Sequence, residues 1–314
     1  MIDYTIGIDV GGTKIAVGLF DENKNLIAKT RHASNPMMDG PAFFSHIAEI
    51  VSEMLPNSDK TKIRGIGVGM PSYINFEKGY IIKTSNLTNI KDFPARDFLS
   101  DKLGGIKVVL DNDGRAGALA EHRYGAGRGF SHMLYCPVST GISSGIIINS
   151  ELFRGTYGFS GESGHMIVTP GEGIMCGCGN RGCFMSWCSG SMIVKHIKNW
   201  ISAGEKSVLT EIAGSLDMIQ AFHLNEAYDG GDELAVRAIE QMAKYLSAWL
   251  YNLYMTLNIN CFVFGGGLLN IGDRLFPRIR RQFDEYNQDS HPVYFKTAEL
   301  GEDFGIIGAA ELIG

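Results

Sequence analysis

The stretch GIDVGGTKIAVGLFDENKNLIA, residues 7–28, is the most informative part of this chain. Two runs of apolar and β-branched residues flank Gly11 and Gly12, a pattern that predicts two strands joined by a tight turn. An acid, Asp9, stands just before the glycines, and Thr13 follows them. A hairpin turn can be built far more simply, so these polar residues at the tip point to a function.

The tip has the residue types of a phosphate site. Gly11, Gly12 and Thr13 can present backbone N–H groups and a hydroxyl to an anion, since glycine lets the backbone approach closely. Asp9 is anionic and cannot bind phosphate itself, but it can hold a magnesium ion that does. The tip lies between two strands, and the Walker pattern is absent, which excludes the common phosphate loops. A plain Gly-Gly hairpin turn is the alternative.

Composition limits the possible classes of protein. The chain has 314 residues, 45% of them hydrophobic, which is enough for two lobes with separate cores. A net charge of −6 disfavours nucleic acid or an anionic membrane as the main partner. We find no secretory signal and no apolar stretch of membrane-spanning length, so we expect a cytoplasmic protein. Its six cysteines then need an explanation other than disulfides.

The chain divides into two similar halves that alternate strands with helices, the pattern of α/β layers. The first half predicts strands at residues 4–10, 14–20, 26–30, 63–70 and 107–110, and helices at 41–54 and 93–102. The second half predicts strands at residues 130–137, 145–148 and 261–264, a long amphipathic helix at 232–257 and a terminal helix at 304–313. We therefore expect two α/β lobes around a cleft.

Two further segments carry polar residues where strands end. Asp113 follows an apolar strand and opens a helix, so it either caps that helix or faces a ligand beyond the strand's carboxyl end. The glycine turn at residues 139–145, STGISSG, lies between two strands of the second half. It mirrors the first hairpin tip and predicts a second phosphate loop.

A cysteine-rich segment offers metal ligands. His165, Cys176, Cys178 and Cys183 lie within nineteen residues, and this set suits a tetrahedral structural zinc with one imidazole and three thiolates. The alternative is a group of free thiols in a glycine-rich loop. The other cysteines, which lie in apolar surroundings, are interpreted as small buried hydrophobes; they are Cys136, Cys188 and Cys261.

Taken together, these segments make the chain resemble the ROK family of bacterial sugar kinases. The resemblance rests on five segments in order, GIDVGGTK (7–14), NDGRAGALAE (112–121), GESGH (161–165), CGCGNRGC (176–183) and FGGG (264–267). It implies an actin-like, hexokinase-type ATPase fold. The first lobe would span residues 1–117, with a C-terminal helix at about 303–314 packing back on it. The second would span 118–302 and carry the zinc loop. A homodimer that uses ATP, Mg²⁺ and a structural Zn²⁺ is implied as well.

The resemblance also assigns roles to residues. Asp113 would be the general base that takes the proton from the accepting hydroxyl, usually on C6 of a hexose. The implied sugar contacts are Asn86, Asn112, Asp113, Glu162 and His165. The implied nucleotide contacts are Asp9, Gly11, Gly12, Thr13, Lys14, Thr140, Gly141, Gly265, Gly266 and Gly267. His165 would bind zinc through one ring nitrogen and sugar through the other, since a metal fixes the tautomer and the ring orientation.

One departure from the family pattern concerns the substrate. Where the family has Cys-x-Glu, with the glutamate accepting hydrogen bonds from sugar hydroxyls, this chain has Cys183-Phe184-Met185. A methionine is a poor acceptor, so a hydroxyl facing it would lose a partner at a cost of about 1–3 kcal/mol. Ser72, where the family commonly has glycine, and the segment around Asn86 look more like the allose-kinase branch than the glucokinases.

Three classes of function follow. A hexose kinase is favoured because both phosphate turns and both acids are present. A degenerate member that binds sugar or nucleotide as a sensor is the alternative, and Met185 supports it. A sugar-responsive DNA-binding repressor would need an N-terminal helix-turn-helix, for which a hairpin beginning by residue 7 leaves no room.

Overall fold

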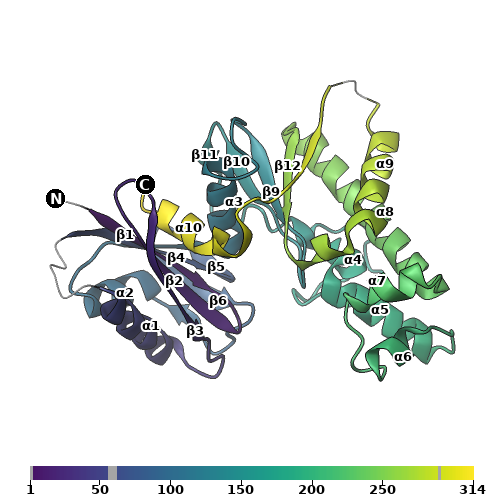
Figure 1. Cartoon of the computed structure of the whole chain (residues 1–314), viewed down its shortest axis with the longest axis horizontal. Helices are drawn as coiled ribbons and strands as arrows, with labels where there is room; N and C mark the ends of the chain where they lie inside the picture. Colours follow the sequence, from purple (N-terminus) through teal and green to yellow (C-terminus); the bar gives the residue numbers. More distant parts are fainter. Residues whose placement is uncertain (1–2, 56–61, 289–290) are drawn as a thin grey trace. The chain divides into compact units, whose positions relative to one another are not determined.

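The N-terminal hairpin lies at the centre of a five-stranded sheet in the computed structural model, which describes residues 3–55, 62–288 and 291–314 (Figure 1). The strand order is β3-β2-β1-β4-β8. These strands are β1 (Tyr4–Val10), β2 (Lys14–Phe20), β3 (Leu26–Ala33), β4 (Ile63–Met70) and β8 (Val108–Asn112). β1 pairs antiparallel with β2 and parallel with β4, and β4 pairs parallel with β8. The carboxyl ends of β1, β4 and β8 therefore meet at one edge.

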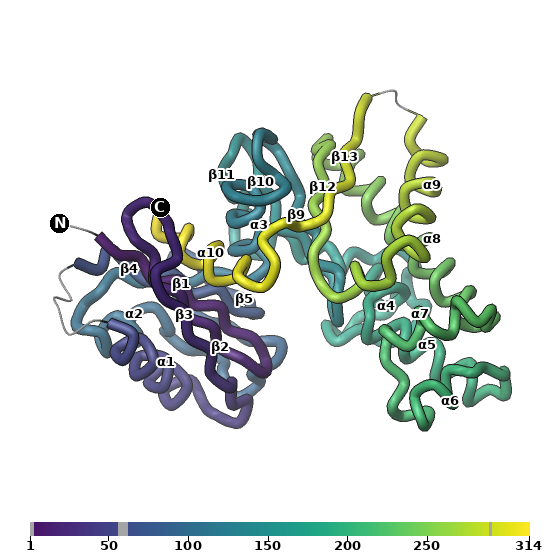
Figure 2. Tube along the Cα trace, viewed as in Figure 1, coloured from purple at the N-terminus to yellow at the C-terminus, as the bar shows by residue number. Residues whose placement is uncertain are grey.

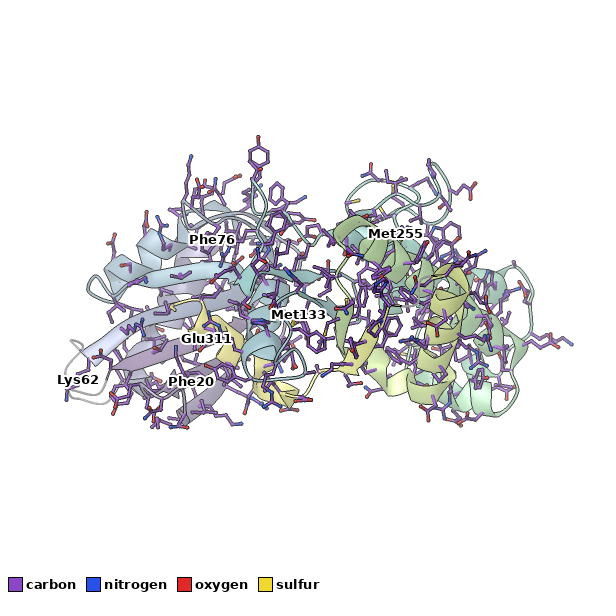
Figure 3. The ribbon with its side chains drawn as sticks, turned by 90° about the horizontal axis from the view of Figure 1, so that it is seen from above. Phe20, Lys62, Phe76, Met133, Met255 and Glu311 are labelled. Carbon is purple, nitrogen blue, oxygen red and sulfur yellow. The ribbon has the colours of Figure 1, made fainter. Side chains whose placement is uncertain are left out.

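Helices cover both faces of this sheet because β1, β2 and β4 are apolar on both sides. Alternate residues of β2, Ile15, Val17 and Leu19, belong to the core beneath α1 (Gly40–Met54) and α2 (Ala95–Lys102). On the other face, Phe20 packs with Ile306 and Ala310 of α10 (Phe304–Glu311). Phe20 is labelled in Figure 3. α3 (Asp113–Arg123) packs against α10 and β4.

Helix α10 lies unusually close to the strands beneath it. A Cβ at Gly7 would collide with the carbonyl of Ile306, and one at Gly67 with that of Ala309. Only glycine fits these two strand positions, because helix backbone occupies the space of a side chain. In the Cα trace, the yellow C-terminal helix accordingly lies on the purple N-terminal strands (Figure 2).

Short strands complete the first unit. A three-stranded antiparallel sheet of order β5-β6-β7 is formed by β5 (Ser72–Asn75), β6 (Tyr80–Thr84) and β7 (Lys91–Phe93). The sequence pattern did not predict it, because three to five residues give too little alternation to recognise. A β-hairpin of β10 (Gly145–Ile148) and β11 (Glu151–Leu152) pairs with the first part of β9 (Met133–Pro137).

The second unit is mostly helical. Its long helix α8 (Glu233–Leu257) starts at the N-cap Asp232, whose carboxylate accepts from the Ala235 N–H at 2.9 Å, and ends at Asn258 in the left-handed conformation. The other helices are α4 (Met185–Cys188), α5 (Gly190–Ser202), α6 (Leu209–Ala213), α7 (His223–Asp229) and α9 (Phe276–Tyr286), with the short helices η2 (Ser163–His165) and η3 (Gly267–Arg274). The parallel strands β12 (Cys261–Gly265) and β13 (Tyr294–Thr297) belong to this unit.

The two units do not follow the lobe boundaries expected from the sequence. The first contains the described residues of Met1–Tyr135, Gly145–Ser160 and Ala298–Gly314, and the second contains Cys136–Ser144 and Gly161–Thr297. The chain thus passes between them four times, where lobes of 1–117 and 118–302 would imply fewer crossings. All of α3 stays in the first unit because it packs on α10. None of the helices formed by the described residues has the length and apolar character to cross a bilayer.

Candidate functional site

Two acids stand at the carboxyl edge of the first unit's sheet. Asp9 lies near the end of β1 and pairs in register with Gly69 of β4. Asp113 is the first residue of α3, directly after β8, and a Cβ at Gly69 would lie 3.7 Å from its Cα. The two acids therefore flank one glycine. The N-cap of α3 is Asn112, whose side-chain oxygen accepts from the Gly114 N–H at 2.9 Å, so the carboxylate of Asp113 is not the cap.

The two acids influence each other's charge. Burial and, second to it, the negative charge of Asp113 raise the pKa of Asp9 from 3.8 to about 6, while Lys14 opposes the shift. A Cβ at Gly305, in the first turn of α10, would collide with the Asp9 carboxylate. A buried carboxylate whose charged form is destabilised in this way favours either a bound proton or a bound cation.

The hairpin tip lies beside another residue that the resemblance assigned to the site. A Cβ at Gly12 would be 3.1 Å from the Cβ of Asn86, so the tip and the exposed Asn86 are neighbours. The Gly11 N–H donates to the Lys14 carbonyl at 2.8 Å, and the Thr13 carbonyl accepts from the Ser34 N–H at 3.0 Å. The turn is thus closed by its own backbone and fastened to the chain after β3, while the side chains of Thr13 and Lys14 are exposed.

In the second unit, the predicted second phosphate turn lies against the glycine segment that follows β12. The Val138 N–H donates to the Gly265 carbonyl at 2.8 Å, and the Leu268 N–H donates to the Val138 carbonyl at 3.1 Å. Gly266 has φ of 92° and no space for a Cβ beside Val138, so this position requires glycine. The start of α5 supports the turn, because the Ser191 hydroxyl donates to the Thr140 carbonyl at 2.7 Å.

The Glu162–His165 segment borders the same turn. The His165 N–H donates to the Glu162 carbonyl at 3.0 Å, which forms the single turn η2. Gly164 in this turn packs on the carbonyl of Ile142. Met185 lies between the two elements, since its Cε is 3.5 Å from a Cβ at Gly141 and its Cβ is 3.4 Å from a Cβ at Gly164. A half-buried methionine thus separates the phosphate turn from the Glu162–His165 segment.

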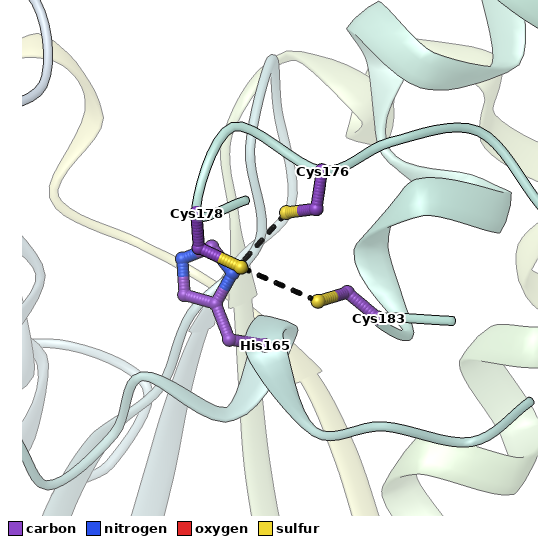
Figure 4. Close-up of side chains that lie close together, drawn as sticks. All are labelled: His165, Cys176, Cys178 and Cys183. Carbon is purple, nitrogen blue, oxygen red and sulfur yellow. Dashed lines mark hydrogen bonds between the residues drawn. The ribbon is translucent and has the colours of Figure 1, made fainter. Parts of the chain in front are cut away.

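The four predicted metal ligands converge in the second unit (Figure 4). Their ligand atoms all lie within 4.8 Å of one another. The Cys176 sulfur is 3.4 Å from His165 Nδ1, and the sulfurs of Cys178 and Cys183 are 3.5 Å apart. Ligand atoms around a tetrahedral ion with metal–sulfur bonds of about 2.3 Å are about 3.8 Å apart, so the spacing fits. Burial, together with the neighbouring thiols, raises the pKa of Cys183 to about 12, so a metal would have to displace its proton.

The orientation of His165 allows two contacts. Nδ1 faces the thiol of Cys176, while Nε2 lies 4.0 Å from the Glu162 carboxylate. The imidazole therefore presents one nitrogen to the cysteine cluster and the other to the segment that the resemblance assigned to sugar. A metal bound at Nδ1 would fix the tautomer and the orientation of the His165 ring, so that Nε2 makes the second contact.

The structure divides the candidate residues between the units. The first unit brings together Asp9, Gly11, Gly12, Thr13, Lys14, Asn86, Asn112 and Asp113. The second unit brings together Thr140, Gly141, Glu162, His165, Cys176, Cys178, Cys183, Gly265, Gly266 and Gly267.

Sequence reasoning missed Asp111 and Arg115, a buried ion pair beside Asp113, the candidate base. The available signal was a charged pair with i,i+4 spacing at the end of an apolar strand.

Comparisons with known proteins show which proteins this chain resembles. The family model described as the ROK family matches residues 5–314. A glucokinase of Halalkalibacterium halodurans is 31% identical over 314 residues, 99% of this chain and 94% of that protein. A solved ROK family glucokinase from Streptomyces griseus, in complex with glucose and AMPPNP, is 30% identical and covers 98% of each chain with a TM-score of 0.79. The xylose repressor of Bacillus spizizenii is 29% identical over 99% of this chain and 77% of its own length. The expected actin-like fold is confirmed.

The raised pKa of Asp9 predicts how stability depends on pH. The folded protein holds a proton on Asp9 up to about pH 6, whereas the unfolded chain loses it near 3.8. The stability that this proton contributes is therefore present below about pH 4 and is lost as the pH rises to about 6. Asp9→Asn should make the protein more stable than wild type at pH 7 by about 2–3 kcal/mol, measured by urea unfolding from pH 4.5 to 8.

Asp21→Asn is the control, because Asp21 is an exposed acid of the same unit whose pKa is lowered by hydrogen bonds from Asn25 and Asn23. It should give no gain in stability above pH 6. An Asp9→Asn protein no more stable than wild type at pH 7 would contradict the assigned environment of Asp9.

Proposed function

The chain belongs to the ROK family, and we propose that it is an ATP-dependent kinase that phosphorylates a hexose at its 6-hydroxyl. The family match confirms the resemblance seen in five sequence segments. One observation carries the proposal, the pairing of Asp9 with Asp113 at the sheet edge where parallel α/β strands bind ligands. The likeness to a glucokinase solved with glucose and an ATP analogue supports it.

The proposed reaction is an in-line phosphoryl transfer. The sugar hydroxyl oxygen forms a bond to the γ-phosphorus of ATP, the bond from that phosphorus to the β-phosphate oxygen breaks, and ADP leaves. Asp113 accepts the hydroxyl proton, a step that general bases accelerate by about 10²–10⁴-fold. Asn112, which caps the helix that starts at Asp113, contacts the sugar together with Asn86, Glu162 and His165.

The phosphates and their cation have candidate partners in the glycine turns predicted from the sequence. Gly11, Gly12, Thr13 and Lys14 form one phosphate turn, and Thr140 and Gly141 form the other, with Gly265, Gly266 and Gly267 near the adenosine. Mg²⁺, when bound, neutralises charge on the β- and γ-phosphate oxygens. Asp9 would hold it, and the fit is supported by the raised pKa of Asp9, because a cation relieves the repulsion from Asp113.

We assign Zn²⁺ to His165, Cys176, Cys178 and Cys183. Three thiols and one imidazole at tetrahedral spacing leave no open position, so the ion is structural. Its role is to hold the cysteine loop and, through Nδ1, the ring of His165. The proposed homodimer rests on the family resemblance. The proposed cytoplasmic location is supported by the six cysteines, which are free thiols in the structure.

The sugar is proposed to differ from plain glucose because of Met185. The side chain of Met185 lies near Gly164 at its Cβ and near Gly141 at its Cε, next to the proposed sugar and phosphate contacts, and its thioether cannot replace a carboxylate acceptor. We therefore propose a non-glucose hexose, and allose is one candidate because the segments around Ser72 and Asn86 resemble the allose-kinase branch. Met185 also supports the alternative function, a protein that binds sugar or nucleotide as a sensor without turnover.

The kinase is tested by ADP release with MgATP across hexoses, ketohexoses and N-acetylhexosamines. At least one sugar should stimulate ADP release, and Asp113→Asn should lower its kcat by about 10²–10⁴-fold because the amide cannot accept the proton. Asp39→Asn is the matched control, since Asp39 caps α1 in the same unit and takes no part in the site. It should keep wild-type turnover.

Two results would contradict the proposed kinase mechanism. If no sugar stimulates ADP release while sugar or ATP still raises the melting temperature, the sensor function replaces the kinase. If Asp113→Asn retains wild-type kcat with the cognate sugar, the assigned base is wrong.

Met185→Glu tests whether residue 185 sets the choice of sugar. The new carboxylate should accept hydrogen bonds from sugar hydroxyls and raise kcat/KM for glucose by about 10-fold or more relative to the native substrate. Met185→Leu, which keeps the volume without the sulfur, should leave the sugar preference unchanged. An unchanged preference in Met185→Glu, in protein that remains folded, would show that residue 185 does not contact the sugar.

Cys178→Ser tests the metal assignment. Cys178 is the least buried of the three thiols, so its replacement is the mildest change to the loop. We expect metal analysis to find about one zinc per chain in wild type and almost none in Cys178→Ser. Cys188→Ala removes a buried thiol outside the ligand set and should keep its zinc. Equal zinc content in wild type and Cys178→Ser would contradict the site.

A further inference from the structure

A buried ion cluster lies directly behind the proposed catalytic turn. We call Asp111, Arg115 and Arg154 the Asp111 cluster. Asp111, with no exposed surface, precedes Asn112 at the end of β8. Its Oδ1 accepts from Arg115 Nη1 and from the Asn112 N–H, both at 2.8 Å, and its Oδ2 accepts from Arg154 Nε at 2.7 Å. One carboxylate thus joins two guanidinium groups to the backbone of Asn112.

The two arginines extend the cluster to the loop after β11. Arg115 is almost fully buried, and its Nη2 donates to the carbonyl of Gly158 and, at 3.4 Å, to that of Ser160. Arg154 belongs to the same loop, and its guanidinium carbon lies 3.8 Å from the ring centre of Phe76, which Figure 3 labels. The loop is therefore tied at both ends to the residue that precedes Asn112.

Stability alone does not account for such a cluster. Buried ion pairs pay a large desolvation cost and are often replaceable by apolar residues without loss of stability. Arg115 also keeps its Nε, a buried donor, without a hydrogen-bond partner among the described residues. An unpaired buried donor is a further cost, so a strictly structural device would be better served by apolar packing.

The connections of the cluster indicate what it does. On one side, Asp111 holds the N–H of Asn112, the cap of the helix that begins with Asp113. On the other side, Arg115 holds the carbonyls of residues 158 and 160, and the chain then continues directly to Glu162. The turn with the base and the segment leading to a sugar contact are therefore fixed to one carboxylate.

We propose that the Asp111 cluster is a positioning device for phosphoryl transfer, with Arg115 and Arg154 as positioning residues that act through Asp111 on Asn112 and Asp113. The proposal rests on the proposed kinase function. None of the three side chains is assigned a contact with substrate. Loss of one arginine should let the turn shift, and a misplacement of about 1 Å can cost about 10²-fold in rate.

Arg154→Met is the main test, because Arg154 is the more exposed arginine and its removal leaves the Asp111–Arg115 pair. We expect kcat/KM for the cognate sugar to fall about 10–100-fold while the KM for ATP changes less than about twofold. Hydrogen exchange followed by mass spectrometry should show faster exchange in residues 111–116 and 154–160, with the rest of the first unit unchanged.

Arg278→Met is the matched control. Arg278 is similarly exposed, pairs with Glu240 at 2.6 Å and lies over the ring of Tyr228, all within the second unit. It should retain wild-type turnover and exchange. A second variant, Arg115→Lys, keeps the positive charge but lacks the forked guanidinium group that donates to Asp111 and to two backbone carbonyls. We expect it to lose turnover by a similar factor with an unchanged KM for ATP.

The outcomes separate the two proposals. Wild-type protein that turns over no sugar overturns the kinase alone, and the exchange data then decide whether the cluster holds the turn. Unchanged exchange in residues 111–116 of Arg154→Met overturns the positioning device. So does faster exchange across the whole first unit with wild-type kcat/KM, because that result means a structural role only.

Discussion

The contact of helix α10 with strands β1 and β4 is the constraint on which the first unit depends. Helix backbone takes the place of side chains at Gly7 and Gly67, so helix and sheet approach more closely than side chains would allow. The same helix packs on α3, where a Cβ at Gly308 would collide with the Ala116 carbonyl. The end of the chain thereby holds both the strand that carries Asp9 and the helix that carries Asp113.

That packing explains why two acids can be kept together in spite of their repulsion. Asp9 is partly buried beside the start of α10, and its pKa of about 6 records the cost of charging it near Asp113. A surface acid pair would separate, but here both backbones are fixed by the sheet edge and by close helix packing. A bound cation would relieve the cost of charging Asp9 in this arrangement, as the proposed magnesium site requires.

The second unit holds its candidate residues in place by a different set of contacts. Backbone hydrogen bonds fasten the turn at Thr140 to the glycine segment after β12, and the cysteine cluster faces Nδ1 of His165. Met185 lies between the turn at Gly141 and the Glu162–His165 segment. Positions in this unit therefore depend on short loops tied to each other rather than on a sheet edge.

Much of this could be predicted from the sequence, because the relevant signals are local. The bounds of β1, β2 and β4 agree with the expected strands, and the clustering of His165 with three cysteines was expected from their spacing. Tertiary structure alone decided the rest. The β5-β6-β7 sheet is built from strands too short to show a pattern, and all of α3 belongs to the first unit because it packs against α10. The Asp111 cluster joins residues about forty positions apart, Asp111 and Arg154, and such a contact is determined by the folded backbone and not by any spacing along the chain.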